Sequence, residues 1–344
     1  MAIPVLICDD SSVARKLMTR SLPSDWDIDI SYAVDGSEAL DQLKAGKGDI
    51  LFLDLNMPVM DGYETLDAIL ENNLQTTVLV VSGDIQPEAY NRVMAMGAVS
   101  FIKKPIGVEE LTEILQELDL YKLTSTNTTD VDHSILGERS KQEIVAAGAV
   151  QYRDCIQEIA NVAMGQSADL LARLLNVFIK LPVPNVNLLE VCDLKMALSH
   201  VAKDSTYSAV CQGFIGAGIA GEALLIFSDS SYADMAKLLK YEGELNDYAE
   251  LELIMDIASI LVGAFTGGIA EQLNLSFSQG HPVVLGQHVD ISELVASNES
   301  RWKETLTIEI TYEIENYNIT CDLLLLFTED SIDNLNRRLL YLMD

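Results

Sequence analysis

The sequence predicts an α/β protein: an N-terminal doubly wound, five-stranded parallel sheet, followed by a C-terminal α+β domain. Three observations carry this prediction. Short apolar runs recur in the first part of the chain, an amphipathic segment follows each run, and the second part contains an internal repeat. With 344 residues, the chain is long enough for two domains of about 150 residues each.

The first part alternates two patterns. The apolar runs cover 3–8, 28–32, 50–53, 78–81 and 99–102, and the helical patterns cover 12–22, 37–44, 62–70, 87–96 and 108–118. Strands that are each followed by a helix indicate a parallel sheet with helices on both faces.

The stretch 124–129 (TSTNTT) is polar, β-branched and uncharged, and DVDHS follows it. Such a composition is typical of a linker. We therefore expect one domain over residues 1–122, a linker over 123–139 and a second domain over 140–344.

The second domain contains two similar stretches. Ser259 follows Asn161 by 98 positions, and each is followed by a glycine four positions later and by a proline after 22 intervening residues. The runs LLIF at 224–227 and LLLF at 324–327 also correspond. We expect a duplicated unit with pseudo-two-fold symmetry, with halves at about 140–240 and 241–344.

Composition excludes several classes of function. The chain has 22 Lys and Arg against 53 Asp and Glu, a net charge of −31, which repels nucleic acid and anionic lipid. The five scattered cysteines form no C-x-x-C pair, which is typical of a reducing compartment. We expect a cytoplasmic protein without membrane insertion.

Polar residues follow several of the predicted strands. Asp9 and Asp10 follow the first strand, Asp54 follows the third, Ser82 ends the fourth and Lys104 follows the fifth. The carboxyl ends of parallel strands share one edge of the sheet, where ligands bind. Three crowded carboxylates require a hard cation, and all-oxygen ligands favour Mg²⁺.

This set resembles the CheY-like receiver domain of response regulators, a flavodoxin-like fold. The resemblance covers residues 1–122 and rests on Asp9-Asp10, the run from Asp54 to Gly62, Ser82-Gly83 and Lys104-Pro105. It implies that a CheA-like histidine kinase phosphorylates Asp54.

The resemblance also implies roles for the other positions. Asp10 binds Mg²⁺ directly, Asp9 binds it through water, and the backbone carbonyl of Asn56 is a further ligand. Lys104 and Ser82 contact the phosphoryl group. Phe101 occupies the position of the aromatic switch residue, and any switching there works by packing because Phe has no hydroxyl.

The segment around residue 160 has helical periodicity. Asp154, Glu158, Asn161 and Gly165 follow one another at offsets of 4, 3 and 4, which places them along one stripe of a helix. We expect this stripe to face a cleft or solvent. A carboxylate can anchor a cation, and a carboxamide can both donate to and accept from a water molecule.

The stripe resembles the signature of the CheC/CheX/FliY chemotaxis phosphatases. The pattern Asp154-x3-Glu158-x2-Asn161-x22-Pro184 matches in full, and the resemblance spans roughly 140–344. It implies that Glu158 pairs with the active-site lysine of a phosphorylated CheY-type receiver and that Asn161 aligns the attacking water.

The second copy departs from this signature. It reads Glu252-x3-Asp256-x2-Ser259-x22-Pro282, so a shorter carboxylate replaces Glu and a hydroxyl replaces the carboxamide. We expect Asp256 and Ser259 to form a degenerate second site.

Three functions fit these observations. The chain can hydrolyse the acyl phosphate of separate CheY-type receivers under control of its own receiver, which is the interpretation that the sequence favours. It can remove the phosphoryl group from its own Asp54 in cis. It can also be a non-catalytic, phosphorylation-gated docking module for a flagellar switch protein or a CheD-like partner.

Overall fold

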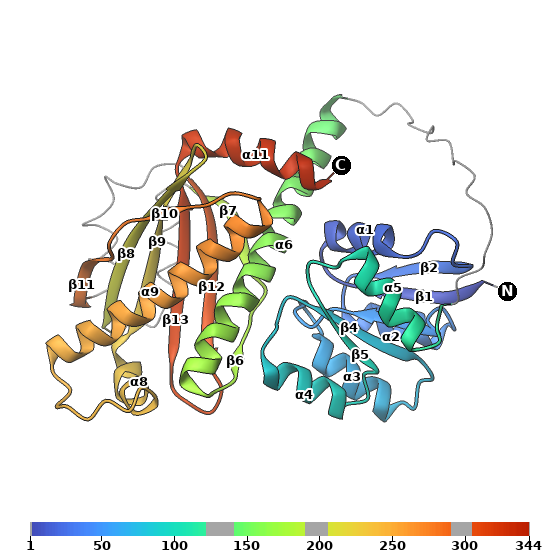
Figure 1. Ribbon diagram of the computed structural model, residues 1–344, viewed down its shortest axis with the longest axis horizontal. Helices are drawn as coiled ribbons and strands as arrows, with labels where there is room; N and C mark the ends of the chain where they lie inside the picture. Colours follow the sequence, from blue (N-terminus) through green and yellow to red (C-terminus); the bar gives the residue numbers. More distant parts are fainter. Residues whose placement is uncertain (1, 122–140, 190–205, 290–304, 344) are drawn as a thin grey trace. The chain divides into compact units, whose positions relative to one another are not determined.

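The computed structural model describes residues 2–121, 141–189, 206–289 and 305–343, so the predicted linker lies outside the described residues (Figure 1). By its contacts the chain divides into two compact units. The first unit contains Met1–Ser82 and Val93–Cys155, and the second contains Gly83–Arg92 and Ile156–Asp344.

The first sheet has five parallel strands in the order β2-β1-β3-β4-β5. They are β1 (Ile3–Cys8), β2 (Ile28–Ala33), β3 (Ile50–Leu53), β4 (Thr77–Ser82) and β5 (Ser100–Lys103). The helices that alternate with them are α1 (Ser12–Ser21), α2 (Gly36–Lys44), α3 (Gly62–Glu71), α4 (Pro87–Ala95) and α5 (Val108–Glu117). The predicted N-terminal sheet is confirmed, and every element begins and ends within one or two residues of its predicted bounds.

Both faces of this sheet are buried. All four residues of β3 are buried, and its alternate side chains enter two separate apolar clusters. One cluster contains Leu66 of α3 and the other contains Leu111 of α5. Helices therefore cover both faces, as the doubly wound prediction requires. The strand order reverses between β1 and β3, and this reversal marks where a ligand binds in such sheets.

The second unit contains an antiparallel eight-stranded sheet in the order β10-β8-β9-β13-β12-β6, with β11 paired to β8 and β7 paired to β12. Its strands are β6 (Ile179–Lys180), β7 (Asn185–Leu189), β8 (Tyr207–Gly216), β9 (Ile219–Ser228), β10 (Ser278–Gln279), β11 (Val283–Val289), β12 (Thr305–Ile314) and β13 (Thr320–Phe327). This arrangement confirms an α+β fold for the second part of the chain.

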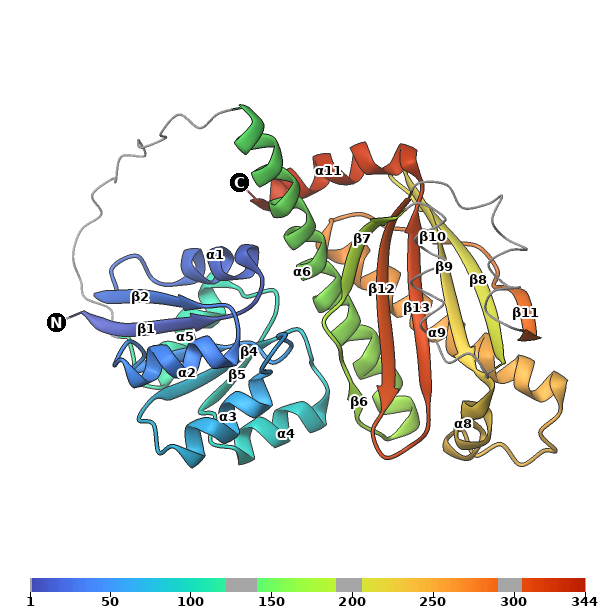
Figure 2. The same cartoon turned by 180° about the vertical axis from the view of Figure 1, so that it is seen from behind.

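Two long helices, α6 (Lys141–Leu175) and α9 (Asp247–Gln272), lie on the same face of this sheet (Figures 1 and 2). They touch where a Cβ built on Gly268 would lie 2.9 Å from the Cα of Ala163. The other helical elements of the second unit that the structure describes are the 3₁₀ turn η1 (Asp229–Ser231), α8 (Tyr232–Leu238) and α11 (Glu329–Met343). Among the described residues, α9 alone is long and apolar enough to cross a membrane, and 61% of its apolar window is buried inside the protein. That burial is typical of a core helix.

Within their described residues, the two halves of the second domain have the same order of elements: a long helix, two shorter strands, two longer strands and a final helix. Strands β9 and β13, one from each half, pair at the centre of the sheet. The early strands of each half pair with the opposite half, β10 and β11 with β8, and β6 and β7 with β12. A pseudo-two-fold repeat requires this order, although the repeat itself remains a prediction.

Candidate functional site

An acidic cluster lies at the carboxyl ends of β1 and β3. Asp9, Asp10 and Asp54 each bring a carboxylate oxygen to within 4.8 Å of the other two. Asp54 is only 1% exposed. The structure thus brings together the three carboxylates that the sequence predicted to meet, because they directly follow adjacent parallel strands.

The ammonium of Lys104 reaches this cluster from the end of β5. Its Nζ lies 2.7 Å from Asp9 Oδ2 and 3.4 Å from Asp54 Oδ1. Burial, followed by the charge of Asp9, raises the pKa of Asp10 to about 6, and Lys104 opposes this rise. Three carboxylates facing one ammonium leave excess negative charge in a buried site. The all-oxygen donor set fits a hard divalent cation such as Mg²⁺.

The other predicted residues of this site surround the same edge of the sheet. Ser82 is fully buried at the end of β4, where its carbonyl accepts a hydrogen bond from the backbone N–H of Lys104 at 3.0 Å. Asn56 is also buried, two positions after Asp54. Phe101 is partly buried on β5 and packs against the apolar cluster that contains Leu66. The functional roles of these three residues remain predictions.

The predicted stripe of α6 is a helix, but it is not open along its length. Glu158 is partly buried, whereas Asn161 is only 4% exposed and Gly165 is buried. The expectation that the whole stripe faces a cleft or solvent is therefore wrong. Within the second unit, the backbone at Gly83 covers this part of the helix: a Cβ on Gly165 would lie 1.8 Å from the Gly83 carbonyl oxygen.

The same segment, Gly83–Arg92, is tied to β6 by a buried side chain. Gln86 is 1% exposed, and its Nε2 donates to the Ile179 carbonyl at 2.8 Å. Its Oε1 accepts from the Ile179 backbone N–H at 2.9 Å. Asp84 accepts from the Gln86 backbone N–H at 3.0 Å and from Nε2 at 3.1 Å. The sequence gives no signal for the contact between Gln86 and Ile179, since the two residues are 93 positions apart and no local motif marks them.

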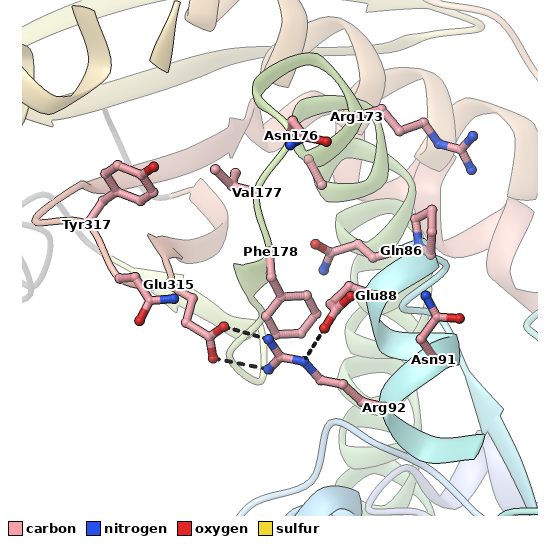
Figure 3. Close-up of a pocket in the computed structure, with 13 residues that line it drawn as sticks. Gln86, Glu88, Asn91, Arg92, Arg173, Asn176, Val177, Phe178, Glu315 and Tyr317 are labelled. Atoms are coloured by element: carbon pink, nitrogen blue, oxygen red, sulfur yellow. Dashed lines mark hydrogen bonds and ion pairs between the residues drawn. The ribbon is translucent and has the colours of Figure 1, made fainter. Parts of the chain in front are cut away.

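A pocket of about 700 Å³ opens beside this contact within the second unit (Figure 3). Arg92 donates to the two Glu315 carboxylate oxygens at 3.0 and 2.5 Å and through Nε to Glu88 at 3.1 Å. Its guanidinium carbon lies 4.0 Å from the ring centroid of Phe178. A planar guanidinium suits such two-pronged pairing and stacking, which a lysine cannot reproduce.

The corresponding stripe of α9 is open. Asp256 and Ser259 are exposed, and the Ser259 hydroxyl donates to the Met255 carbonyl at 2.9 Å in its own helix. Gly267, further along α9, would place an added Cβ in open space. This hydroxyl is thus engaged within its own helix, and the degeneracy of the second site stays a prediction.

A second polar cluster, which no sequence motif indicates, lies around His288 on β11. A hydrogen bond of 2.8 Å joins His288 Nδ1 to Asp229 Oδ2, and His288 Nε2 lies 3.2 Å from Glu250 Oε2 of α9. The hydrogen bond to Asp229 and the nearby carboxylates raise the pKa of His288 against the opposing effect of burial. The three residues come from three separate elements, so their spacing in the sequence carries no signal.

Comparisons with known proteins find a family match for the N-terminal part of the chain. Residues 5–116 match the family described as the response regulator receiver domain. A protein-glutamate methylesterase/protein-glutamine glutaminase of Geobacter sulfurreducens is 38% identical over 119 residues, which cover 34% of this chain and 32% of that protein. Its counterpart in Halalkalibacterium halodurans is 39% identical over 127 residues, which cover 36% of each protein. The chain thus spans about a third of the length of these curated relatives.

Two solved structures are also similar. The response regulator domain of Thermotoga maritima CheB is 29% identical and covers 34% of this chain and 96% of that structure, with a TM-score of 0.31. Thermotoga maritima FliY is 19% identical and covers 56% of this chain and 96% of that structure, with a TM-score of 0.43.

Proposed function

We propose, from the premise that residues 5–116 form a response regulator receiver domain, that the second domain is an aspartyl-phosphate phosphatase. In this proposal a CheA-like histidine kinase phosphorylates Asp54 in the cytoplasm. The CheC-like domain, at about 140–344, then hydrolyses the acyl phosphate of CheY-type receivers in chemotaxis signalling. The receiver family implies the histidine kinase, whereas the phosphatase role and the chemotaxis substrate are our inference.

The acidic cluster supports the first half of this proposal. A carboxylate oxygen of Asp54 attacks the phosphorus of a phosphohistidine, and the bond between phosphorus and the histidine nitrogen breaks. Asp9, Asp10, Asp54 and the backbone carbonyl of Asn56 would hold Mg²⁺, which neutralises phosphoryl charge when bound. The Lys104 ammonium, held at 2.7 Å from Asp9, supplies a second positive charge at the same place.

The helix α6 supports the second half. Glu158 and Asn161 lie one turn apart, so a lysine of a bound receiver can pair with Glu158 while the Asn161 carboxamide holds a water. Water attacks the phosphorus in line, the bond between phosphorus and the aspartate oxygen breaks, and inorganic phosphate leaves. The aspartate recovers its carboxylate, and the proton of the water passes to phosphate or solvent.

One observation supports this proposal: a backbone segment packs closely against the face of α6 at Asn161 and Gly165, because a Cβ on Gly165 would lie 1.8 Å from the Gly83 carbonyl oxygen. A helix face that is only exposed to solvent needs neither a buried carboxamide nor a glycine at the point where another backbone segment crosses it.

The test is a phosphoryl-decay assay on a stand-alone, phosphorylated CheY-type receiver with the full-length Asp54→Asn chain, which cannot itself be phosphorylated. We expect this chain to accelerate decay, and we expect the additional change Asn161→Ala to reduce the acceleration by roughly 100-fold. Ser259→Ala is the matched control from the second copy and should leave the rate unchanged. Equal acceleration with and without the Asn161→Ala change would contradict the proposal.

A second candidate function has one observation in its favour. The 4% exposure of Asn161 means that a separate receiver can reach it only after segment Gly83–Arg92 moves. A phosphorylation-gated docking module for a flagellar switch protein or a CheD-like partner would need no accessible carboxamide. An unchanged decay rate in the assay above, in the presence of either chain, would favour this candidate.

A further inference from the structure

The turn between β1 and α1 carries Asp9 and Asp10, two of the three carboxylates of the acidic cluster. The side chain of Arg15 bridges the backbone of this turn. Its Nη1 donates to the Asp9 carbonyl at 2.5 Å and to the Asp10 carbonyl at 3.1 Å. Each carbonyl fixes the orientation of one planar peptide group, so the φ and ψ angles of Asp10, which lies between the two groups, are restrained.

Helix α1 places Arg15 beside this turn. The Ser11 hydroxyl caps the helix by accepting from the Ala14 backbone N–H at 3.1 Å, and the Ser11 carbonyl accepts from the Arg15 backbone N–H at 3.1 Å. The helix begins at Ser12, so Arg15 lies within about one turn of its N-terminal end. The helix dipole disfavours a cation at this end. Two charge-assisted hydrogen bonds offset that cost, which indicates that Arg15 serves the turn and not the helix.

Asp9 is fixed by contacts of its own. Its Oδ1 accepts from the Ser11 backbone N–H at 2.8 Å, and its Oδ2 accepts from Lys104 Nζ at 2.7 Å. The cluster also requires the carboxylate of Asp10 to come within 4.8 Å of its neighbours. Where that carboxylate lies relative to Asp9 depends on the two peptide groups that Arg15 holds.

We propose that Arg15 is a positioning residue for the cation site: it holds the turn at Asp9 and Asp10 in the conformation in which the acidic cluster binds Mg²⁺. The inference rests on the receiver half of the function proposed above and deepens it, because this cation serves phosphorylation of Asp54. Arg15 acts through the backbone of two ligands. Groups that orient metal ligands in this way typically contribute about 10- to 100-fold to metal affinity.

The positive charge of Arg15 acts on a bound cation in the opposite sense. A guanidinium repels Mg²⁺, so its removal would strengthen cation binding if charge alone mattered. If Arg15 positions the turn, its removal weakens cation binding instead. Lys16, the next residue of α1, is exposed and carries the same charge. Lys16→Met therefore reports the effect of charge while the two carbonyl contacts of Arg15 stay in place.

The test measures the dissociation constant for Mg²⁺ of the full-length, unphosphorylated chain by titration calorimetry. We expect Arg15→Met to raise this constant by about 10-fold, and Lys16→Met to leave it unchanged or to lower it slightly. Arg15→Lys should give an intermediate constant, because an ammonium can also donate to two carbonyls but lacks the planar fork. A constant for Arg15→Met at or below the wild-type value overturns the inference. If Arg15→Met does not fold, a wild-type constant for Arg15→Lys overturns it.

A second measurement separates this inference from the proposed function. Phosphorylation of Asp54 by acetyl phosphate is followed over a range of Mg²⁺ concentrations. We expect Arg15→Met to raise the half-saturating Mg²⁺ concentration by about 10-fold and to leave the rate at saturating Mg²⁺ nearly unchanged, which a general loss of structure would not do. An unchanged half-saturating concentration overturns the role of Arg15 and leaves Asp54 as the phosphoacceptor. Weaker Mg²⁺ binding in Arg15→Met, with no phosphorylation of the wild-type chain, contradicts the proposed role of Asp54 and supports that of Arg15.

Discussion

Gly83 and Gly165 approach each other so closely that a methyl group on Gly165 would lie 1.8 Å from the Gly83 carbonyl oxygen. Neither residue has the positive φ angle that favours glycine. The requirement for glycine at Gly165 therefore comes only from the close approach of the backbone at Gly83. A contact of this kind gives substitutions at Gly165 a different outcome from substitutions at other helical glycines.

Alanine at Gly165 and at Gly267 should have opposite effects on stability. Alanine is favoured over glycine inside a helix by about 0.5–1 kcal/mol, so Gly267→Ala, which meets nothing within 4 Å, should raise the free energy of unfolding by about that amount. Gly165→Ala must displace the Gly83 backbone and should lower it. Urea titrations of the two variants measure the difference. An equal gain in both would show that the two backbones are not in contact in solution.

Magnesium should stabilise the protein through the acidic cluster. Binding to the folded state alone raises the free energy of unfolding by about 2.7 kcal/mol at a concentration 100 times the dissociation constant. We expect the melting temperature to rise with added MgCl₂, and Asp10→Asn to remove most of this rise. Asp256→Asn removes a carboxylate outside the cluster and is the control. A rise that persists in Asp10→Asn would place the cation elsewhere.

The ion pairs of His288 should make stability depend on pH. Because Asp229 and Glu250 raise its folded pKa, the protonated form stabilises the fold. This contribution is complete below the unfolded pKa of about 6.5 and is lost as the pH rises through the folded pKa. His288→Gln should therefore lower the free energy of unfolding at pH 6 by about 1 kcal/mol or less, as the ring is partly exposed, and by less at pH 9. An identical loss at both pH values would rule out a role for the charge.

The pair of Arg92 and Glu315 should couple in a double-mutant cycle. Both side chains are partly exposed, so we expect a coupling of about 1 kcal/mol between Arg92→Met and Glu315→Gln, and less at high salt. Arg92→Lys should recover little of it, because lysine lacks the two-pronged geometry and the stacking on Phe178. Chemical unfolding of the four proteins supplies the cycle. Full recovery by lysine would mean that charge alone matters.

The acidic cluster could be predicted well from the sequence. In a parallel sheet the carboxyl ends of all strands lie at one edge, so residues that directly follow the strands lie near one another. Asp9, Asp54 and Lys104 each follow a strand of one parallel sheet, so all three lie at the same edge of that sheet. Their meeting requires no knowledge of distant contacts.

The surroundings of Asn161 could not be predicted in the same way. Helical periodicity placed Glu158 and Asn161 on one stripe, but what covers a stripe depends on residues elsewhere, here the backbone of Gly83 and Asp84. His288 illustrates the same limit: its partners Asp229 and Glu250 come from a 3₁₀ turn and a helix that only the folded sheet brings together. Periodicity predicts which side chains share one face of a helix, but which residues pack against that face depends on the tertiary structure.

The two hydrogen bonds between Gln86 and Ile179 make position 86 sensitive to side-chain length. Asparagine carries the same amide but is one methylene shorter, so it would not span both backbone groups, and glutamate would have no N–H to donate to the Ile179 carbonyl. Length and amide chemistry together therefore restrict which residues this position can accept.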